Sequence, residues 1–273
     1  MPTLITLFLA VQLAGAPPPA SPAAPSDDSQ LVEQLKGCEE LNKCSASVSL
    51  LKRGSKAGPA IINGLNNPNE LVRFWACGLL SEIKPKGAFE ALVKALNDKK
   101  IRVRAGAIFA LGSLGNKKAT PVLLKGLKDR DPNIRIAASI GLGTLLDPAS
   151  FDGLVNAMKT DKDDEVRVYA MLALGDMGNK KAIPSVRVRL QEDGKPRVRA
   201  LACATLAMLG DKTSVGPMIK ALEQDLAKEV QIECANALGR MGDKQAIPAL
   251  EKASRRPEPV RSAVLRALQV LKK

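Results

Sequence analysis

The sequence predicts an all-α protein, a right-handed α-solenoid of about seven helix-pair repeats behind an N-terminal helical cap. A thirteen-residue segment recurs seven times without a gap, with starts 30 to 32 residues apart. Apolar residues make up 45% of the chain but aromatic residues only 3%, so Ala and Leu must form closely packed helices. Because one pair of short helices cannot bury its own apolar faces, the pairs must stack on each other.

Composition excludes several classes of site. The 273 residues include no histidine, which rules out Ser-His-Asp and Cys-His nucleophiles and every His-ligated metal site. Lys and Arg number 41 against 28 Asp and Glu, giving a net charge of +13. This charge is compatible with nucleic acid, anionic lipid or an acidic protein as the partner, and selects none of them.

The N-terminal residues indicate export. Residues 4–16 are apolar, too few to span a bilayer, and end in Ala14-Gly15-Ala16, which suits signal peptidase. We therefore expect residues 1–16 to be a signal peptide and the protein to be periplasmic or secreted. Residues 17–29, rich in Pro, Ala and Ser, are expected to be a disordered linker.

Two short helices are expected within residues 30–54, and they would form a capping hairpin that shields the first repeat. The repeat array then covers residues 55–273. In each copy of the recurring segment, positions one, five, nine and twelve are apolar and lie on one face of a helix. Position nine is always leucine: Leu80, Leu111, Leu142, Leu174, Leu206, Leu238 and Leu268.

A second apolar segment precedes each copy, and four of these segments carry a proline where the first helical turn tolerates it: Pro121, Pro184, Pro217 and Pro248. Each repeat is therefore helix A, a short polar turn and helix B. Glycine follows helix B as a left-handed stop at Gly115, Gly178, Gly210 and Gly242, whereas Leu146 takes this place in one repeat.

Pro121, Asp129 and Arg135 show a pattern of Pro, Asp eight residues later and Arg six after that. This spacing resembles that of the HEAT-repeat family, in its short bacterial form named after phycobilisome lyase subunits. The resemblance implies a structural ladder in which Asp caps helix B and Arg reaches a neighbour's Asp or carbonyl. Its members are Asp98, Arg104, Asp129, Arg135, Asp161, Arg167, Asp193 and Arg199.

The five cysteines do not form a metal or redox motif, because no CxxC is present. Cys38 and Cys44 lie across the turn of the cap, and a disulfide between them would contribute about 2 kcal/mol. The alternative is a pair of half-buried thiols. Cys77, Cys203 and Cys234 are interpreted as small core residues of helix B; Cys203 and Cys234 lie in adjacent repeats, and the sequence does not show whether they meet.

Positions four, seven and eleven of helix B point away from helix A and would line the concave wall. Large apolar groups facing solvent there would mark a surface for a protein or peptide; the alternative is that they pack between neighbouring B helices. The candidates for partner binding are Trp75, Phe109, Ile140, Tyr169, Leu172, Leu201 and Met208.

The turns between repeats are basic, and those within repeats are rich in acids. Lysines spaced one repeat apart could follow a polyanion, or simply keep the array soluble. No aromatic residues are interleaved with them, which does not favour nucleic acid. This basic rim consists of Lys84, Lys86, Lys117, Lys118, Lys180, Lys181, Lys212 and Lys244.

Two functions are compatible with these features. The favoured one is a non-enzymatic, exported, monomeric scaffold that binds a protein or peptide on its concave face, with no cofactor, metal or membrane span. The alternative is a cytosolic HEAT-like lyase subunit or a nucleic-acid-binding protein that uses the basic rim. No residue is a candidate for catalysis.

Overall fold

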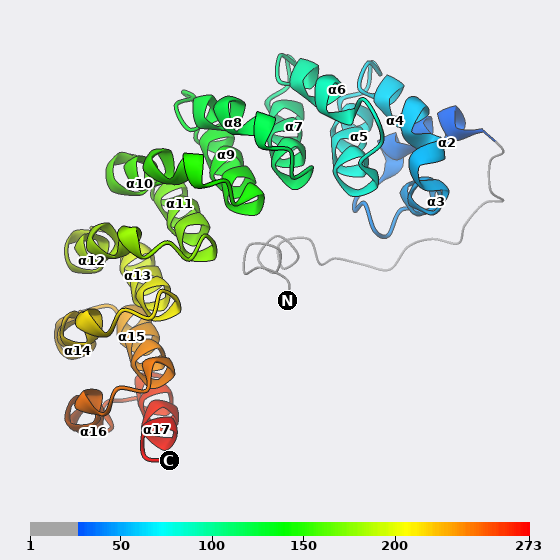
Figure 1. Ribbon diagram of the computed structural model, residues 1–273. Coiled ribbons are helices and arrows are strands. Elements are labelled where there is room, and N and C mark those ends of the chain that lie inside the picture. Colours follow the sequence, from blue (N-terminus) through cyan, green and yellow to red (C-terminus); the bar gives the residue numbers. More distant parts are fainter. Residues whose placement is uncertain (1–26) are drawn as a thin grey trace. The chain divides into compact units, whose positions relative to one another are not determined.

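The computed structural model describes residues 27–273, and within this range every regular element is a helix. The signal peptide and most of the linker predicted from the sequence lie outside the described residues. The chain divides into two compact units, which meet in sequence between Ser150 and Phe151. Each unit is a stack of helices, so the predicted all-α solenoid class is confirmed (Figure 1).

The first unit opens with a cap of two helices, α2 (Asp28–Gln34) and α3 (Ser45–Arg53), joined through the 3-10 turn η1 (Leu35–Gly37). Helix α2 starts inside the segment expected to be linker, because the Asp27 side chain accepts a 3.0 Å hydrogen bond from the Ser29 amide and caps it. The linker therefore ends before Asp27. Leu31, Leu35 and Leu50 of the cap are fully buried.

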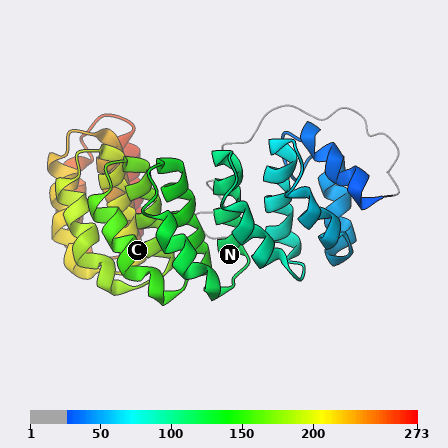
Figure 2. The same cartoon turned by 90° about the horizontal axis from the view of Figure 1, so that it is seen from above.

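Three A/B pairs follow the cap in the first unit. The A helices are α4 (Gly58–Gly64), α6 (Ala88–Ala95) and α8 (Thr120–Gly126), and the B helices are α5 (Glu70–Ile83), α7 (Ile101–Ser113) and α9 (Pro132–Leu145). Each B helix packs against the next, α5 on α7 and α7 on α9. Figure 2 shows these successive helices side by side.

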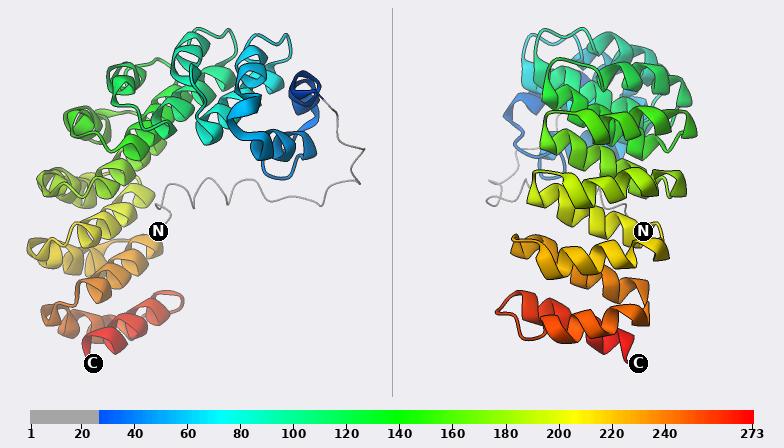
Figure 3. Two further views of the ribbon diagram at one scale, coloured as in Figure 1. Left: turned by 45° about the vertical axis from the view of Figure 1, so that its right-hand side comes forward. Right: turned by 90° about the vertical axis from the view of Figure 1, so that its left-hand side faces the viewer.

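Four pairs form the second unit. The A helices are α10 (Phe151–Thr160), α12 (Ile183–Glu192), α14 (Val215–Gln224) and α16 (Ile247–Ala253), and the B helices are α11 (Asp164–Asp176), α13 (Pro196–Met208), α15 (Lys228–Met241) and α17 (Val260–Leu271). The A helices form one layer and the B helices the other (Figure 3). The structure therefore contains the seven pairs that the repeats predict.

The recurring apolar positions form the core of both units. The position-nine leucines from Leu80 to Leu238 are fully buried, and Leu268 nearly so. Position ten is usually glycine, which allows close approach: a Cβ on Gly112 would lie 2.4 Å from the Gly141 Cα of the next B helix. Similarly, a Cβ on Gly239 would lie 2.9 Å from the Ala267 Cα. The backbones of α7 and α9, and those of α15 and α17, are therefore in close contact.

Left-handed residues end several helices, as the glycine pattern predicts. Gly115, Gly178, Gly210 and Gly242 all have positive φ. Leu146, which replaces glycine after α9, also has a φ of 53°.

Candidate functional site

An arginine ladder connects neighbouring repeats. The Arg167 guanidinium donates two hydrogen bonds to the Asp193 carboxylate, at 2.9 and 2.8 Å, across to the next repeat. Arg73 binds Asp98 in the same two-pronged way, at 2.6 and 3.0 Å. These arginines also donate to a carbonyl of their own repeat's turn, Arg167 to Asp161 at 2.9 Å and Arg73 to Asn67 at 2.8 Å. The ladder is structural, because its charges are paired and largely buried.

The ladder aspartates do not make the capping hydrogen bonds that the resemblance implied. Their carboxylates do not cap helix B directly; Asp193 Oδ1 accepts a 3.0 Å bond from the amide of Lys195, the residue that precedes the helix. Asp98 bonds the Lys100 amide in the same way, at 2.8 Å. Each aspartate therefore fixes the polar turn through Oδ1 and accepts hydrogen bonds from the arginine with both oxygens.

Not every predicted member of the ladder forms an ion pair with the neighbouring repeat. Arg104 donates to the Asp98 and Lys99 carbonyls of its own turn, and no ion pair links it to Asp129 within the described part of the chain. The structure adds two members absent from the predicted set, Arg73 and Asp225. Both already stood at the matching positions of the repeat, so the alignment alone could have identified them.

Hydrogen bonds hold the ladder carboxylates in the ionised form. Burial by itself would raise the pKa of Asp193, but hydrogen bonds from Arg167 and the Lys195 amide outweigh it, so the pKa is below its usual value. The pKa values of Asp98 and Asp225 are lowered against burial by the corresponding arginines, Arg73 and Arg199. Within these turns Asp98, Asp193 and Asp225 are therefore paired with arginine and are not free surface charges.

Two disulfides are present. Cys38 and Cys44 are joined across the turn of the cap. Cys203 and Cys234, interpreted from the sequence as separate core residues, are also joined, with Cα atoms 5.1 Å apart, and connect α13 to α15. Cys77 remains a buried thiol, and burial raises its pKa to about 12, so it is poorly suited to act as a nucleophile.

Trp75 is not available to a partner, contrary to the prediction. Its side chain is only 7% exposed, and its indole N–H donates a 3.0 Å hydrogen bond to the Cys38 carbonyl of the cap. Leu41 of the cap packs nearby, since a Cβ on Gly78 would lie 3.3 Å from it. The sequence predicted a cap that shields the first repeat, but it did not indicate that this cap would cover Trp75. Trp75 is therefore an anchor for the cap.

Ile140 is also buried, which removes a second predicted partner residue from the first unit. Phe109 is half-buried. For Trp75 and Ile140 the structure favours the alternative that these side chains pack within the array.

The second unit keeps its predicted apolar residues accessible. Positions four, seven and eleven of a helix fall within about 60° of one another, so they form one face of the B-helix layer. We call this surface the 4-7-11 face of the second unit. Met208 on it is 45% exposed, and Tyr169, Leu172 and Leu201 are half-buried. Met208 lies over α11, since a Cβ on Gly175 would be 3.5 Å from its Cε.

Charges border this apolar patch. An ion pair between Glu165 and Arg197 joins α11 to α13. Burial raises the pKa of Tyr169, and the neighbouring Glu165 adds to the shift, so the phenol stays protonated at neutral pH. Asp176, at the end of α11, is half-buried, and burial raises its pKa. Its Oδ2 atom is buried without a hydrogen-bond partner within the described range.

The face becomes polar towards α15 and α17. A cleft of about 260 Å³ lies between these two helices, and Gly239 and Ala267 are at its floor. The other residues that line it are Asn236, Arg240, Arg266 and Val270. Val270 is 58% exposed, and Arg240 pairs with Glu233 at 2.7 Å.

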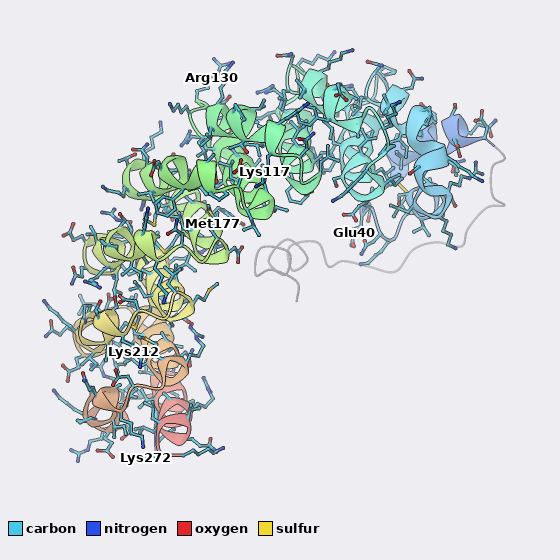
Figure 4. All side chains as sticks on the ribbon, in the orientation of Figure 1. Glu40, Lys117, Arg130, Met177, Lys212 and Lys272 are labelled. Atoms are coloured by element: carbon cyan, nitrogen blue, oxygen red, sulfur yellow. A yellow bond between two sulfur atoms is a disulfide. The ribbon has the colours of Figure 1, made fainter. Side chains whose placement is uncertain are left out.

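All eight lysines of the basic rim are exposed, and none forms an ion pair with another described residue. Lys117 and Lys212 mark its position in each unit, at the 3-10 turns η3 (Lys117–Ala119) and η6 (Lys212–Ser214) that lead into the A helices (Figure 4). Each unit therefore presents solvated lysines at its turns between repeats.

Other kinds of site were also sought in residues 27–273. No group of three or more Cys, Asp or Glu side chains lies close enough to hold a metal ion there. No helix in this range is long and apolar enough to cross a bilayer.

The repeats match the family model of HEAT repeats over residues 58–132, 120–198 and 187–269. The chain belongs to the HEAT-repeat family. This HEAT-repeat protein has the helical pairs and, in part, the arginine ladder that the resemblance implied. None of the curated protein sequences matches it significantly.

Solved structures share its fold. The X-ray structure of YibA from E. coli is 23% identical, with a TM-score of 0.62 over 93% of this chain and all of that one. A chain of the CpcE–CpcF phycocyanin lyase complex from Nostoc sp. PCC7120 is 23% identical, with a TM-score of 0.50 over 78% of this chain and 94% of that one. A chain of the Kap95p–RanGDP complex is 13% identical, with a TM-score of 0.53 over 91% of this HEAT-repeat protein and 45% of that chain. At these identities the likeness shows the fold alone.

Proposed function

We propose that this protein is a non-enzymatic, exported scaffold, a monomer that binds a protein or peptide on the 4-7-11 face of its second unit. The observation that carries the proposal is the accessible apolar patch of Tyr169, Leu172, Leu201 and Met208 on the two packed B helices α11 and α13. Accessible apolar groups with polar neighbours are typical of surfaces that contact another chain. Of the seven predicted partner residues, four lie in this patch.

Among residues 27–273, the carboxylates and the thiol with shifted pKa values are paired or buried, which is in keeping with a binding role. The carboxylates of the ladder are paired with arginine, and the one thiol not in a disulfide is buried. Asp176 is the only acid of the face with a raised pKa among the described residues, and no hydrogen-bonding base or nucleophile accompanies it.

Binding by the face is tested with Met208→Ser. Display of random peptides of about 12 residues provides the probe, since such a peptide, when extended, crosses four B helices spaced roughly 10 Å apart. We expect Met208→Ser to weaken selected peptides about tenfold, as loss of a buried apolar contact does. Leu226→Ser is the matched control, because Leu226 is 99% exposed on a turn away from the face. Equal weakening by both variants, or no selectable peptide, would refute the proposal.

Export is supported by the two disulfides, because such bonds persist in oxidising compartments. It is tested by mass spectrometry of the mature protein from its native host. We expect the loss of about 16 to 24 N-terminal residues, in keeping with a small-residue cleavage site after the apolar run. An intact N-terminus together with reduced cysteines would favour the alternative cytosolic role.

The basic rim supports a second candidate, binding to nucleic acid. Its eight lysines are exposed and unpaired within the described residues, and such a row can follow a phosphate backbone. Titration with single- and double-stranded DNA at several salt concentrations tests it. Steeply salt-dependent binding that is lost in Lys180→Gln/Lys212→Gln would support this candidate over the peptide scaffold.

A further inference from the structure

The 4-7-11 face of the second unit changes character along the stack. The α11 and α13 helices contribute the apolar side chains of Tyr169, Leu172, Leu201 and Met208, whereas α15 and α17 contribute mainly polar ones. These four helices pack successively, α11 on α13, α13 on α15 and α15 on α17, so the two halves are continuous. A ligand that lies across the face must therefore satisfy both halves.

The polar half contains a cleft with convergent cationic and amide groups. Arg240 and Asn236 reach it from α15, and Arg266 and Val270 from α17. Gly239 and Ala267 bring the two helices so close that no side chain fits between them, and this leaves the arginines at the rim of an open floor.

The residues that line the cleft include two arginines and no acid, and the acids beside it already have partners. Glu233, the acid beside it on α15, is already paired with Arg240 at 2.7 Å. Glu258, near Arg266, is held by the Ser262 side chain at 2.6 Å and amide at 3.2 Å. Arg266 is exposed and donates no hydrogen bond to another residue of the described chain. Asp176, the remaining acid of the face, lies at the end of α11 and has a raised pKa.

We infer that this cleft is a carboxylate subsite, and that the ligand of the second unit is a peptide with an apolar segment followed or preceded by an acidic residue. This inference rests on the proposed function and specifies its ligand. Arg240 and Arg266 bind the carboxylate, Asn236 donates its amide, and Val270 contacts the neighbouring apolar atoms. Arginine suits this role because its planar fork matches a carboxylate. A peptide fits better than nucleic acid, since the cleft has no aromatic side chain on which a base could stack.

Spacing within the ligand follows from the helix spacing. Adjacent B helices lie roughly 10 Å apart, which an extended peptide crosses in about three residues. The cleft between α15 and α17 lies one to two helix spacings beyond α13, so apolar side chains seated on α11 and α13 place the acidic residue about three to six positions further along the peptide.

The random peptide display described above tests the subsite. Selection on the wild-type protein is expected to enrich Asp or Glu about three to six residues from an apolar cluster. A selected peptide should bind Arg240→Gln/Arg266→Gln at least about tenfold more weakly, the loss expected when charged hydrogen bonds are removed. Lys180→Gln/Lys212→Gln removes the same charge from the exposed rim and should bind as wild type does.

The possible failures are distinguishable. Peptides without acidic residues that still depend on Met208 would overturn the carboxylate subsite and leave the peptide scaffold standing. Equal weakening by the rim and cleft variants would show general charge attraction and would also overturn the subsite. If no peptide is selected at all, the proposed function itself fails. Circular dichroism melting of each variant confirms that these exposed substitutions leave the fold intact.

Discussion

The guanidinium of Arg199 and the carboxylate of Asp225 form two hydrogen bonds, of 2.7 and 2.8 Å, that join one repeat to the next. The same guanidinium donates to the Asp193 carbonyl of its own repeat at 2.7 Å. Gln231, one repeat later, retains only the carbonyl contact, with its amide 2.5 Å from the Asp225 oxygen. The facing turn there contains Arg255 and Arg256 and no aspartate, which explains why glutamine replaces arginine at this nearly buried position.

Replacing Arg199 by Gln copies the natural arrangement at Gln231 but leaves Asp225 without its partner. We expect a loss of about 2 kcal/mol in the free energy of unfolding, because a mostly buried carboxylate loses two charged hydrogen bonds. Arg197→Gln on the same helix is the control; it removes an exposed pair with Glu165 and should cost less than about 1 kcal/mol. Urea denaturation of both variants measures the difference, and equal losses would contradict the role of the ladder.

The ladder also makes stability depend on pH in acid. The pKa of Asp225 is lowered from 3.8 because the hydrogen bonds from Arg199 and the Ala227 amide outweigh burial. A carboxyl with a lowered folded pKa contributes stability that is complete above its unfolded pKa and is lost as the pH falls through the folded value. We therefore expect stability to fall progressively below about pH 4. Asp225→Asn should be less stable at neutral pH and should show a shallower fall in acid when urea midpoints are measured across this range.

The two disulfides should differ in their contributions to stability. Cys38 and Cys44 enclose six residues of sequence separation, whereas Cys203 and Cys234 enclose 31. In the chain-entropy view the longer loop stabilises more, about 3.5 kcal/mol against about 2 kcal/mol. The double variants Cys203→Ala/Cys234→Ala and Cys38→Ala/Cys44→Ala test this by denaturation without reductant. Under full reduction both differences should vanish, and a larger cost for the Cys38/Cys44 variant would contradict the argument.

Much of the fold was predictable because the same pattern of apolar positions occurs in all seven copies of the repeat. A leucine at position nine in every copy requires a buried seam, and the positions of Leu80 to Leu268 confirm it. The helix ends were predictable for a similar reason, since glycine recurs where the backbone must turn left-handed. The start of the cap was misplaced because the sequence around Asp27 has the composition of a linker and only a single side-chain cap marks the helix.

The site was less predictable, because exposure depends on contacts between segments distant in sequence. Trp75 occupies the same helical position as Tyr169, but the cap covers only Trp75. Nothing in the periodicity of the repeats indicates where the cap will fold. Likewise, Cys203 and Cys234 stand at different positions of their B helices, and only the packing of α13 on α15 brings them together. The polar cleft at Arg240 and Arg266 was not predicted, because the candidates on the concave wall were chosen for their large apolar side chains.

Leu146 offers a direct test of how the repeat ends its helices. Its φ of 53° is left-handed, and its side chain is 45% exposed, so a leucine there bears backbone strain with little burial in return. Because the left-handed conformation costs a non-glycine residue about 1 kcal/mol or more, Leu146→Gly should raise the free energy of unfolding by roughly 0.5 to 1 kcal/mol. Leu265→Gly is the matched control, since Leu265 is 47% exposed but lies inside α17, where glycine should lower stability by about 1 kcal/mol. The same replacement of leucine by glycine should therefore raise the melting temperature and the urea midpoint at position 146 and lower both at position 265. A loss of stability in both variants would mean that the Leu146 side chain contributes more packing than its exposure indicates.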